Sequence, residues 1–332
     1  MSKVKDREYL ALTAMLRARE AKMLDRDRME RMLGAADFGD AAKLLTDCGY
    51  EDMSAMHGNQ IDEALGAHKL AIYEELSRMC PEKELVDVFR LKYDYHNAKV
   101  LVKAGAMGSG GNRLLSDMGR ISGEKLESAV AEGKFSEVPE ALASSIQEAQ
   151  VVLAKTGNSQ AAEFILDRAY HKELGQLAAK QDSAFLKGYV KILIDSANLG
   201  AAVRTLRMKK GIDFLMTALF EGGNASASAV AEAAMNGEAL AVLFQATPLA
   251  GAAALGTEAI RGGSMTKFEL ACDDAVTAYL GSAKMVSFGA EAVLAYLARL
   301  EREITAIRMI LTGRLAGISP AVIRERLRDL NG

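Results

Sequence analysis

The sequence predicts an all-α protein, and both composition and residue spacing favour that fold class. Only 4 of the 332 residues are proline and none is tryptophan, whereas residues with a high helix propensity are abundant. Apolar residues recur three and four positions apart, as they do on one face of a helix, and strand-like alternation is missing. We therefore expect roughly 65–75% helix, about twice the usual fraction.

The first element that we expect is one long helix over residues 4–33, which contain neither glycine nor proline. Leu12, Leu16 and Leu24 recur along it at helical spacing. Its polar side is crowded with charged residues, and this side is either a solvated face with local ion pairs or a docking surface for a partner. The candidate partner contacts on this segment are Arg17, Lys22 and Arg26.

Two glycine-bearing stretches, residues 105–112 and 222–228, interrupt the helical pattern most clearly. They divide the chain into parts of similar length, and we predict three similar helical domains. These domains would comprise residues 1–112, 113–222 and 223–332. A period of about 100 residues is too long for a thin solenoid, whose repeats usually have 20–50 residues.

A weak internal repeat agrees with this division. The pair Asp94 and Asn97 recurs as Asp195 and Asn198, and a third copy lies within residues 301–313. In each copy we expect an acidic residue on the second helix of a hairpin, then a basic residue, then a glycine that ends the helix. Those glycines are Gly105, Gly211 and Gly313.

The repeated residues have two interpretations. A buried acid and asparagine that meet an arginine or lysine of a neighbouring helix would fix the register between helices. A catalytic role would require a base, an electrophile and a pocket, which three copies of one motif are poorly suited to supply. With Arg324 of the last helix included, the motif candidates are Asp94, Asn97, Asp195, Asn198, Arg204, Glu303, Arg308 and Arg324.

Residues 239–257 carry no charge and approach the length of a membrane-spanning helix. They are mostly alanine, glycine and threonine, which favour membrane insertion far less than leucine or phenylalanine. Pro248 also lies at the middle of the stretch, and the residue before a proline is disfavoured in a helix. We therefore expect two short buried helices that are broken at Thr247 and Pro248.

The C-terminal part has the clearest pattern. Apolar residues step by four and three positions along about twenty residues, which predicts an amphipathic helix with a narrow apolar seam. We expect this seam to pack in the core rather than in an intermolecular coiled coil. Gly313 and Gly317 would end the helix, and Ser319 and Pro320 would begin the next one. The seam residues are Val293, Leu297, Leu300, Ile304, Ile307 and Leu311.

Several classes of chemistry are disfavoured by the sequence. The net charge of −3 provides no basic field for nucleic acid. The glycines of residues 105–111 do not lie between a strand and a helix, and no Lys-Ser or Lys-Thr follows them, so a phosphate-binding loop is not predicted. The four histidines and three cysteines are isolated, which disfavours a metal cage. We expect no catalytic site, cofactor, metal or small-molecule substrate.

A small basic cluster follows Arg204 at the end of an expected helix. Its side chains are either solvated at the helix end or contacts for an acidic partner. The candidate contacts in this cluster are Arg207, Lys209 and Lys210.

Matches to one protein family extend in order over nearly the full length of the sequence. The C-terminal segments 288–297, 301–313 and 323–327 resemble the C subunit of the V-type and A-type ATPases, which belongs to the central stalk and is known as the d subunit in eukaryotes. The acid-x-x-Asn-Leu signature of that family is similar to the stretch from Asp195 to Leu199, with Arg204 following. One departure is Ala292, where the family commonly has proline.

This resemblance implies a funnel of three similar helical domains with pseudo-threefold symmetry. It also implies a non-catalytic rotor subunit in the cytoplasm, peripheral to the membrane, in an ATPase that pumps ions or makes ATP. The implied partners are the shaft made by the D and F subunits and a proteolipid ring of the c, K or L type. Two alternatives remain: a helical adaptor unrelated to ATPases, and a helical enzyme whose site has no recognised motif.

Overall fold

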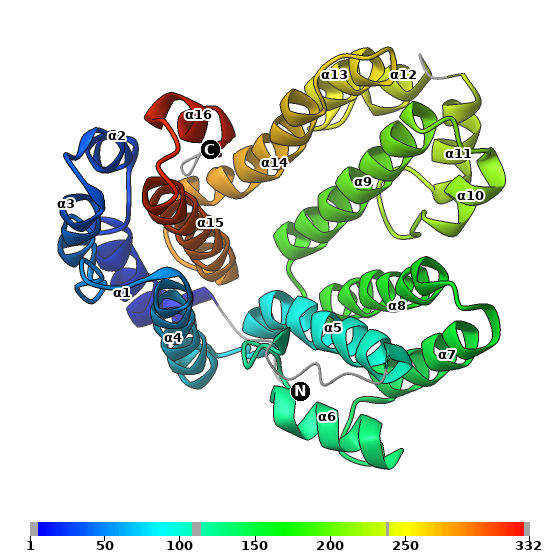
Figure 1. The fold of residues 1–332 in the computed structure, drawn as a ribbon, viewed down its shortest axis with the longest axis horizontal. Coiled ribbons are helices and arrows are strands. Elements are labelled where there is room, and N and C mark those ends of the chain that lie inside the picture. Colours follow the sequence, from blue (N-terminus) through cyan, green and yellow to red (C-terminus); the bar gives the residue numbers. More distant parts are fainter. Residues whose placement is uncertain (1–5, 108–113, 237–238, 329–332) are drawn as a thin grey trace. The chain divides into compact units, whose positions relative to one another are not determined.

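A computed structural model describes residues 6–107, 114–236 and 239–328 of the chain. It is 76% helical without strands in those residues, which confirms the all-α prediction (Figure 1). In chain order the elements are η1 (Asp6–Tyr9), α1 (Leu10–Glu20), α2 (Arg26–Gly34), α3 (Phe38–Lys43), η2 (Thr46–Cys48), α4 (Gly58–Met79), α5 (Glu84–Met107), α6 (Gly123–Glu132), α7 (Glu140–Thr156), α8 (Ser159–Lys180), α9 (Ala184–Arg207), α10 (Ile212–Thr217), α11 (Ala227–Met235), α12 (Ala239–Phe244), α13 (Ala250–Ile260), α14 (Met265–Gly281), η4 (Ser282–Met285), α15 (Ala290–Leu315) and α16 (Pro320–Arg326).

The chain forms two compact units. Unit 1 combines residues Met1–Val86 with Asp273–Gly332, and unit 2 comprises Asp87–Cys272. The division falls inside α5 and α14, so each of these helices contributes to both units. Unit 1 therefore contains both ends of the sequence. The division into three domains at residues 112 and 222 stays a prediction.

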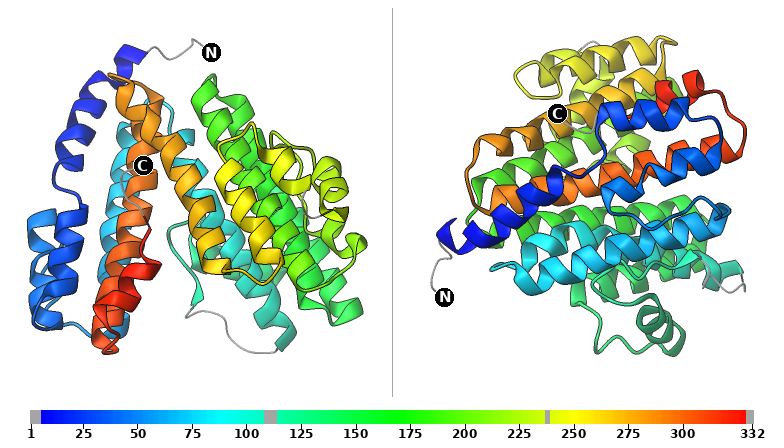
Figure 2. Two further views of the ribbon diagram at one scale, coloured as in Figure 1. Left: turned by 90° about the horizontal axis from the view of Figure 1, so that it is seen from above. Right: turned by 90° about the vertical axis from the view of Figure 1, so that its left-hand side faces the viewer.

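Helix α15 is the centre of unit 1, where α1, α2, α3, α4 and α16 all pack against it (Figures 1 and 2). The six seam residues expected there are all buried, and Leu297 has no exposed surface. Gly313 does not end this helix but lies inside it, where a Cβ would overlap Ile323 of α16. Gly317, with a φ of 68°, follows the end of the helix as expected.

The first segment is not one helix. It is interrupted between α1 and α2, so the expectation for residues 4–33 is wrong in this respect. The side chain of Asp25 accepts a hydrogen bond from the backbone N–H of Arg28 and caps α2. Met23 and Leu24 are buried at the interruption although they precede the cap. The chain at the break is therefore part of the core of unit 1.

In unit 2, α7 and α8 form an antiparallel hairpin, and α9 packs against α8, α11 and α13. The uncharged stretch forms α12 and α13 with Pro248 between them, which confirms the expected break. Leu240, Phe244 and Ala253 of these short helices are buried. In the described part of the chain, no helix is both long and apolar enough to cross a membrane.

Like Gly313, the other two glycines of the repeat do not end helices as expected. Gly105 lies within α5, and Gly211 precedes α10 as its N-cap. Helix α9 ends at Arg207 instead, and Lys209 takes the left-handed conformation with a φ of 55°. Backbone N–H groups of Lys209 and Lys210 then donate to the carbonyls of Leu206 and Thr205. Glycine usually occupies this position because a Cβ disfavours positive φ.

Candidate functional site

Buried acids on three long helices hold the loops that precede other helices. In the first case, Asp94 of α5 accepts hydrogen bonds from the backbone N–H groups of Arg120 and Ile121, at 2.8 and 3.2 Å. Asn97, one turn later, bonds to both the N–H and the carbonyl of Ser116, each at 2.8 Å. Both side chains are fully buried. The pair fixes the loop before α6.

The same arrangement recurs on α9. Asp195 accepts hydrogen bonds from the backbone N–H groups of Asn224 and Ala225, at 3.1 and 3.2 Å. Asn198 bonds to the N–H and the carbonyl of Phe220, each at 2.8 Å. The loop so held precedes α11. We call such a set of hydrogen bonds, from an acid and an asparagine on a helix to the backbone of a later loop, a clamp. The predicted repeat of acid and asparagine is therefore a repeat of two clamps.

Each of these two loops contains a glycine that the clamp requires. A Cβ on Gly119 would overlap the carboxylate of Asp94, and one on Gly223 would overlap that of Asp195. Three residues after each glycine stands a serine that caps the following helix, Ser122 for α6 and Ser226 for α11. The motif is thus an acid and asparagine on a helix, followed in the chain by Gly-x-x-Ser.

The third acid is Glu303 of α15. It is 2% exposed and accepts a hydrogen bond from the backbone N–H of Leu24 at 2.5 Å. Leu24 directly precedes Asp25, the cap of α2, so this loop also leads into a capped helix. Ala306 stands where the other two copies have asparagine. Lys22 stands three residues before the cap, where the other loops have glycine.

The three buried acids differ in the groups that surround their carboxyls. Burial raises the pKa of the Glu303 carboxyl from 4.5 to about 7, while the hydrogen bond from the Leu24 N–H opposes the shift. Asp94 is joined at 2.6 Å by Arg120, which also pairs with Glu173 at 2.8 Å. Burial raises the pKa of Asp94, and the cation beside it acts in the opposite direction. Asp195 is bonded instead to the side-chain amide of Asn224 at 2.8 Å.

The third copy, within residues 301–313, contains two acids, Glu301 and Glu303, and they have different partners. Glu301 is half-buried, pairs with Lys69 at 3.8 Å and accepts a hydrogen bond from Tyr73 of α4. Glu303 is the acid that holds a loop. Residues two apart on a helix point about 200° apart, so only one of the two acids can face a given loop.

The predicted basic members of the motif lie on the surface and not beside the buried acids. Arg204 pairs with Glu269 at 3.2 Å, Arg308 with Asp62 at 2.5 Å and Arg324 with Glu30 at 2.7 Å, all between partly exposed side chains. Exposed pairs of this kind contribute about 0–1 kcal/mol each. Asp94 does meet a basic side chain, but Arg120 lies on the loop before α6 and not on a neighbouring helix. The interpretation that a basic residue fixes the register between helices therefore stays a prediction.

The candidate partner contacts fall into two groups. Arg17 is half-buried and engaged within unit 1, where it pairs with Glu20 at 2.8 Å and donates to the carbonyl of Ala283 at 3.1 Å. Arg207 donates to the carbonyls of Ala259 and Gly263, at the end of α13. Both arginines thus contribute to the fold.

The other candidates are exposed. Lys22 and Arg26 stand at the interruption between α1 and α2, and Lys209 and Lys210 at the end of α9. The ammonium of Lys210 lies 5.9 Å from the centre of the Phe214 ring. These four side chains remain available for a partner, and the two lysines form the more compact group.

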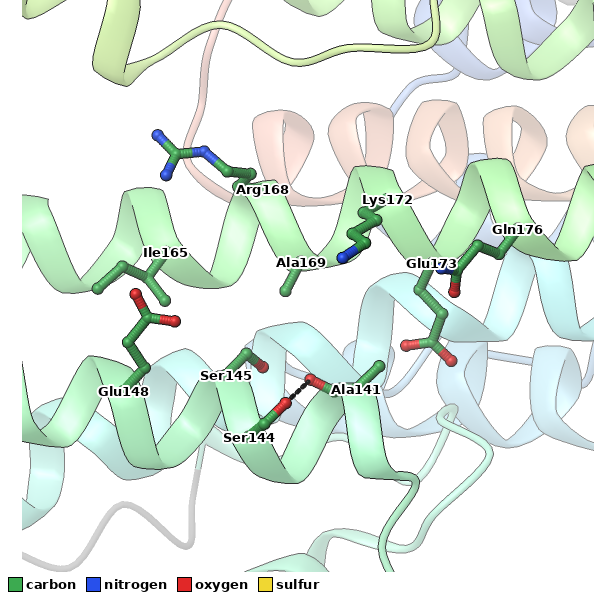
Figure 3. Close-up of a pocket in the computed structure, with 10 residues that line it drawn as sticks. All are labelled: Ala141, Ser144, Ser145, Glu148, Ile165, Arg168, Ala169, Lys172, Glu173 and Gln176. Atoms are coloured by element: carbon green, nitrogen blue, oxygen red, sulfur yellow. Dashed lines mark hydrogen bonds between the residues drawn. The ribbon is translucent and has the colours of Figure 1, made fainter.

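A pocket of about 260 Å³ lies between α7 and α8 (Figure 3). Ser144, Ser145 and Glu148 face it from α7, and Lys172 and Glu173 from α8. The buried Glu173 accepts a hydrogen bond from Tyr95 at 2.8 Å besides its pair with Arg120. This pocket mixes both signs of charge and its buried acid is already satisfied, so it assembles no recognisable reaction centre. In the described ranges, no three histidine, cysteine or acidic residues gather to hold a metal.

Sequence reasoning missed the residues on the loop side of the clamps. Arg120, Asn224 and Leu24 were not identified, because most of the bonds they make use backbone N–H groups that any residue supplies. The glycine and serine of Gly-x-x-Ser were the available signal. They recur at Gly119 and Gly223, 25 and 28 residues after the acids Asp94 and Asp195.

Comparison with known proteins gives matches over nearly the whole chain. Residues 12–326 match the family described as the ATP synthase (C/AC39) subunit. The C subunit of the V-type sodium ATPase of Enterococcus hirae is 23% identical over 326 residues, which cover 97% of this chain and 99% of that protein. The C subunit of the A-type ATP synthase of Haloquadratum walsbyi is 25% identical, with 96% and 97% covered. Its counterpart in the A-type ATP synthase of Methanocaldococcus jannaschii is 23% identical, with 97% and 86% covered.

Proposed function

Because the chain belongs to the ATP synthase (C/AC39) subunit family, a family of rotary ATPase subunits, we propose that it is the non-catalytic coupling subunit of the rotor. In this role it is a socket between the shaft of the D and F subunits and the proteolipid ring of the membrane motor. It is then peripheral to the membrane, on the cytoplasmic side. The observation that carries the proposal is the match over residues 12–326 to the family.

The clamps support a mechanical role. A protein that transmits torque must resist bending where one helix leads into the next. At Asp94, Asp195 and Glu303, a buried carboxylate bonds to the backbone of a loop just before a capped helix. A hydrogen bond to a charged group contributes about 1.5–3 kcal/mol, more than a neutral one. Such loops resist deformation better than loops held by solvent.

Reconstitution tests the proposal directly. The purified chain should bind a D–F complex and, separately, membranes that contain the proteolipid ring. Omitting it from the complex should leave ATP hydrolysis by the soluble part largely unchanged while hydrolysis no longer drives ion transport. Failure to bind either partner, when both partners are correctly folded, would contradict the assignment.

The lysine pair at the end of α9 gives a sharper test. We expect the double charge reversal Lys209→Glu with Lys210→Glu to weaken binding to one of the two partners by about tenfold or more, because the exposed ammonium groups would attract acidic groups. The matched control is Lys125→Glu, an exposed lysine on α6 of the same unit. If the double variant and the control bind equally well, the lysine pair is not a contact.

A further inference from the structure

The surface of unit 2 where α9 ends and α10 begins combines exposed apolar side chains with lysines (Figure 1). Met208, Ile212 and Met216 are between 38% and 55% exposed. These three residues recur at every fourth position, and the last two share one face of α10. Lys209 and Lys210 follow Met208 directly and are exposed as well. We call these five residues the α9–α10 patch.

The backbone of Lys209 is strained within this patch. Its φ of 55° lies in the left-handed region, which disfavours any residue with a Cβ. Among the residues that the structure describes, every other one with a positive φ is a glycine. Glycine at position 209 would relieve the strain, so the fold does not explain the lysine. Strain of this kind indicates a side chain that serves a purpose besides folding.

The charge of the two lysines is not balanced by a neighbouring acid. Neither ammonium forms an ion pair with any residue in the described part of the chain. Residues 204–217 contain four basic side chains and a single acidic one, Asp213. Of the two arginines, Arg204 pairs with Glu269, and Arg207 donates to backbone carbonyls, which leave its charge in place. The surface around the α9–α10 patch therefore has an excess of positive charge.

We propose that the α9–α10 patch binds the surface of an anionic lipid membrane. The lysines attract acidic headgroups, and the exposed apolar side chains then enter the boundary between headgroups and acyl chains. Methionine side chains are flexible and adapt to such an irregular surface.

A protein partner fits the α9–α10 patch less well. Lysine is depleted at protein–protein interfaces. The residues that usually dominate the binding energy of such interfaces are tryptophan, tyrosine and arginine, and the patch contains none of them. The lipid contact is separate from the protein contacts of the proposed function, so it can be tested without them.

The test is co-sedimentation of the isolated chain with lipid vesicles that contain no ATPase subunit. We expect binding to vesicles of phosphatidylcholine mixed with phosphatidylglycerol, a loss of this binding at high salt, and little binding to phosphatidylcholine alone. Lys209→Gln with Lys210→Gln should weaken binding by about fivefold per lysine. The matched control is Lys155→Gln with Lys180→Gln, two exposed lysines at the ends of α7 and α8 in the same unit. The control should weaken binding by at most about twofold, because charges far from the membrane are screened.

Two single substitutions separate lipid binding from folding. Lys209→Gly relieves the strained backbone, so this variant should melt at a higher temperature than the parent while its binding to anionic vesicles falls about fivefold. Met216→Gln removes an exposed apolar side chain and should weaken vesicle binding by a similar factor of about five.

Equal binding to the two kinds of vesicle, or equal losses in the lysine-pair variant and its control, would overturn the proposal. A lysine-pair variant that keeps its vesicle binding but loses binding to the D–F complex would also overturn it, and would identify the patch as a protein contact. Failure of the lipid contact would leave the proposed function standing, because that function is tested with the protein partners.

Discussion

The buried carboxyl of Glu303 makes the stability of unit 1 depend on pH, and Glu303→Gln should remove that dependence. In the folded protein the pKa of this group is about 7 and in an unfolded chain it is near 4.5, because burial penalises the charged form. The folded state therefore binds the proton more tightly than the unfolded state. Below pH 4.5 the group is neutral in both states and its contribution to stability is fully present.

As the pH rises from 4.5 to 7, this contribution is lost. Each unit of pKa difference corresponds to about 1.4 kcal/mol, so the difference between 4.5 and about 7 amounts to about 3 kcal/mol. Glutamine is neutral at every pH and keeps a carbonyl oxygen that can accept from the Leu24 N–H. Any cost of placing the amide in the core is the same at each pH. It therefore does not alter how the free energy of unfolding changes with pH.

The assay is urea unfolding of the parent and Glu303→Gln proteins at pH values between about 4.5 and 8. The free energy of unfolding of the variant, minus that of the parent, should rise with pH by about 3 kcal/mol and level off above about pH 7. The control is Glu325→Gln, an exposed acid on α16 of the same unit, for which the difference should stay constant. A Glu303→Gln difference that is also constant would show that the carboxyl is ionised throughout and that the reasoning from burial is wrong.

Three other predictions concern the core, the clamp and the composition. Leu297→Asp, which buries a carboxylate in the α15 seam, should destabilise unit 1 by several kcal/mol, whereas Val322→Asp on the exposed side of α16 should lower the melting temperature by no more than a degree or two. Gly223→Ala should cost about 2–4 kcal/mol, because its Cβ displaces the Asp195 carboxylate from the loop. The control is Gly175→Ala within α8, where a Cβ meets nothing, and it should stabilise the protein by up to about 1 kcal/mol. Both free energies are measured by chemical unfolding, and equal effects of the two substitutions would refute the clamp. Circular dichroism of the isolated chain should show a helix content near 76%, and substantial β content would be inconsistent with this fold.

Patterns that are local in the sequence predicted local structure well. The 4-3 spacing around Leu297 identified a buried helix, and Pro248 identified the break between two short ones. Glycine was a weaker guide, since a helix tolerates it wherever close packing requires it. Gly313 is retained inside α15 because Ile323 lies against it, and this contact with another helix has no sign in the surrounding sequence.

The contacts that define the clamps are less accessible to sequence reasoning. The choice between Glu301 and Glu303 depends on where Leu24 lies, and Leu24 is 279 residues away in the chain. The break before Asp25 was missed for the same reason. Nothing in residues 4–33 forbids a continuous helix. The bond to Glu303 and the cap on α2 together favour the interrupted form.

The three acids that hold loops also explain why unit 1 contains both ends of the chain. In the first two copies the acid precedes the loop that it holds, with Asp94 followed by Ile121 and Asp195 by Ala225. In the third copy this order is reversed, because the acid follows its loop in the chain. Glu303 instead holds the loop at Leu24, which the start of the chain supplies. The repeat is therefore cyclic: its last acid holds its first loop, and a division of the chain near residue 112 or 222 separates an acid from its own loop.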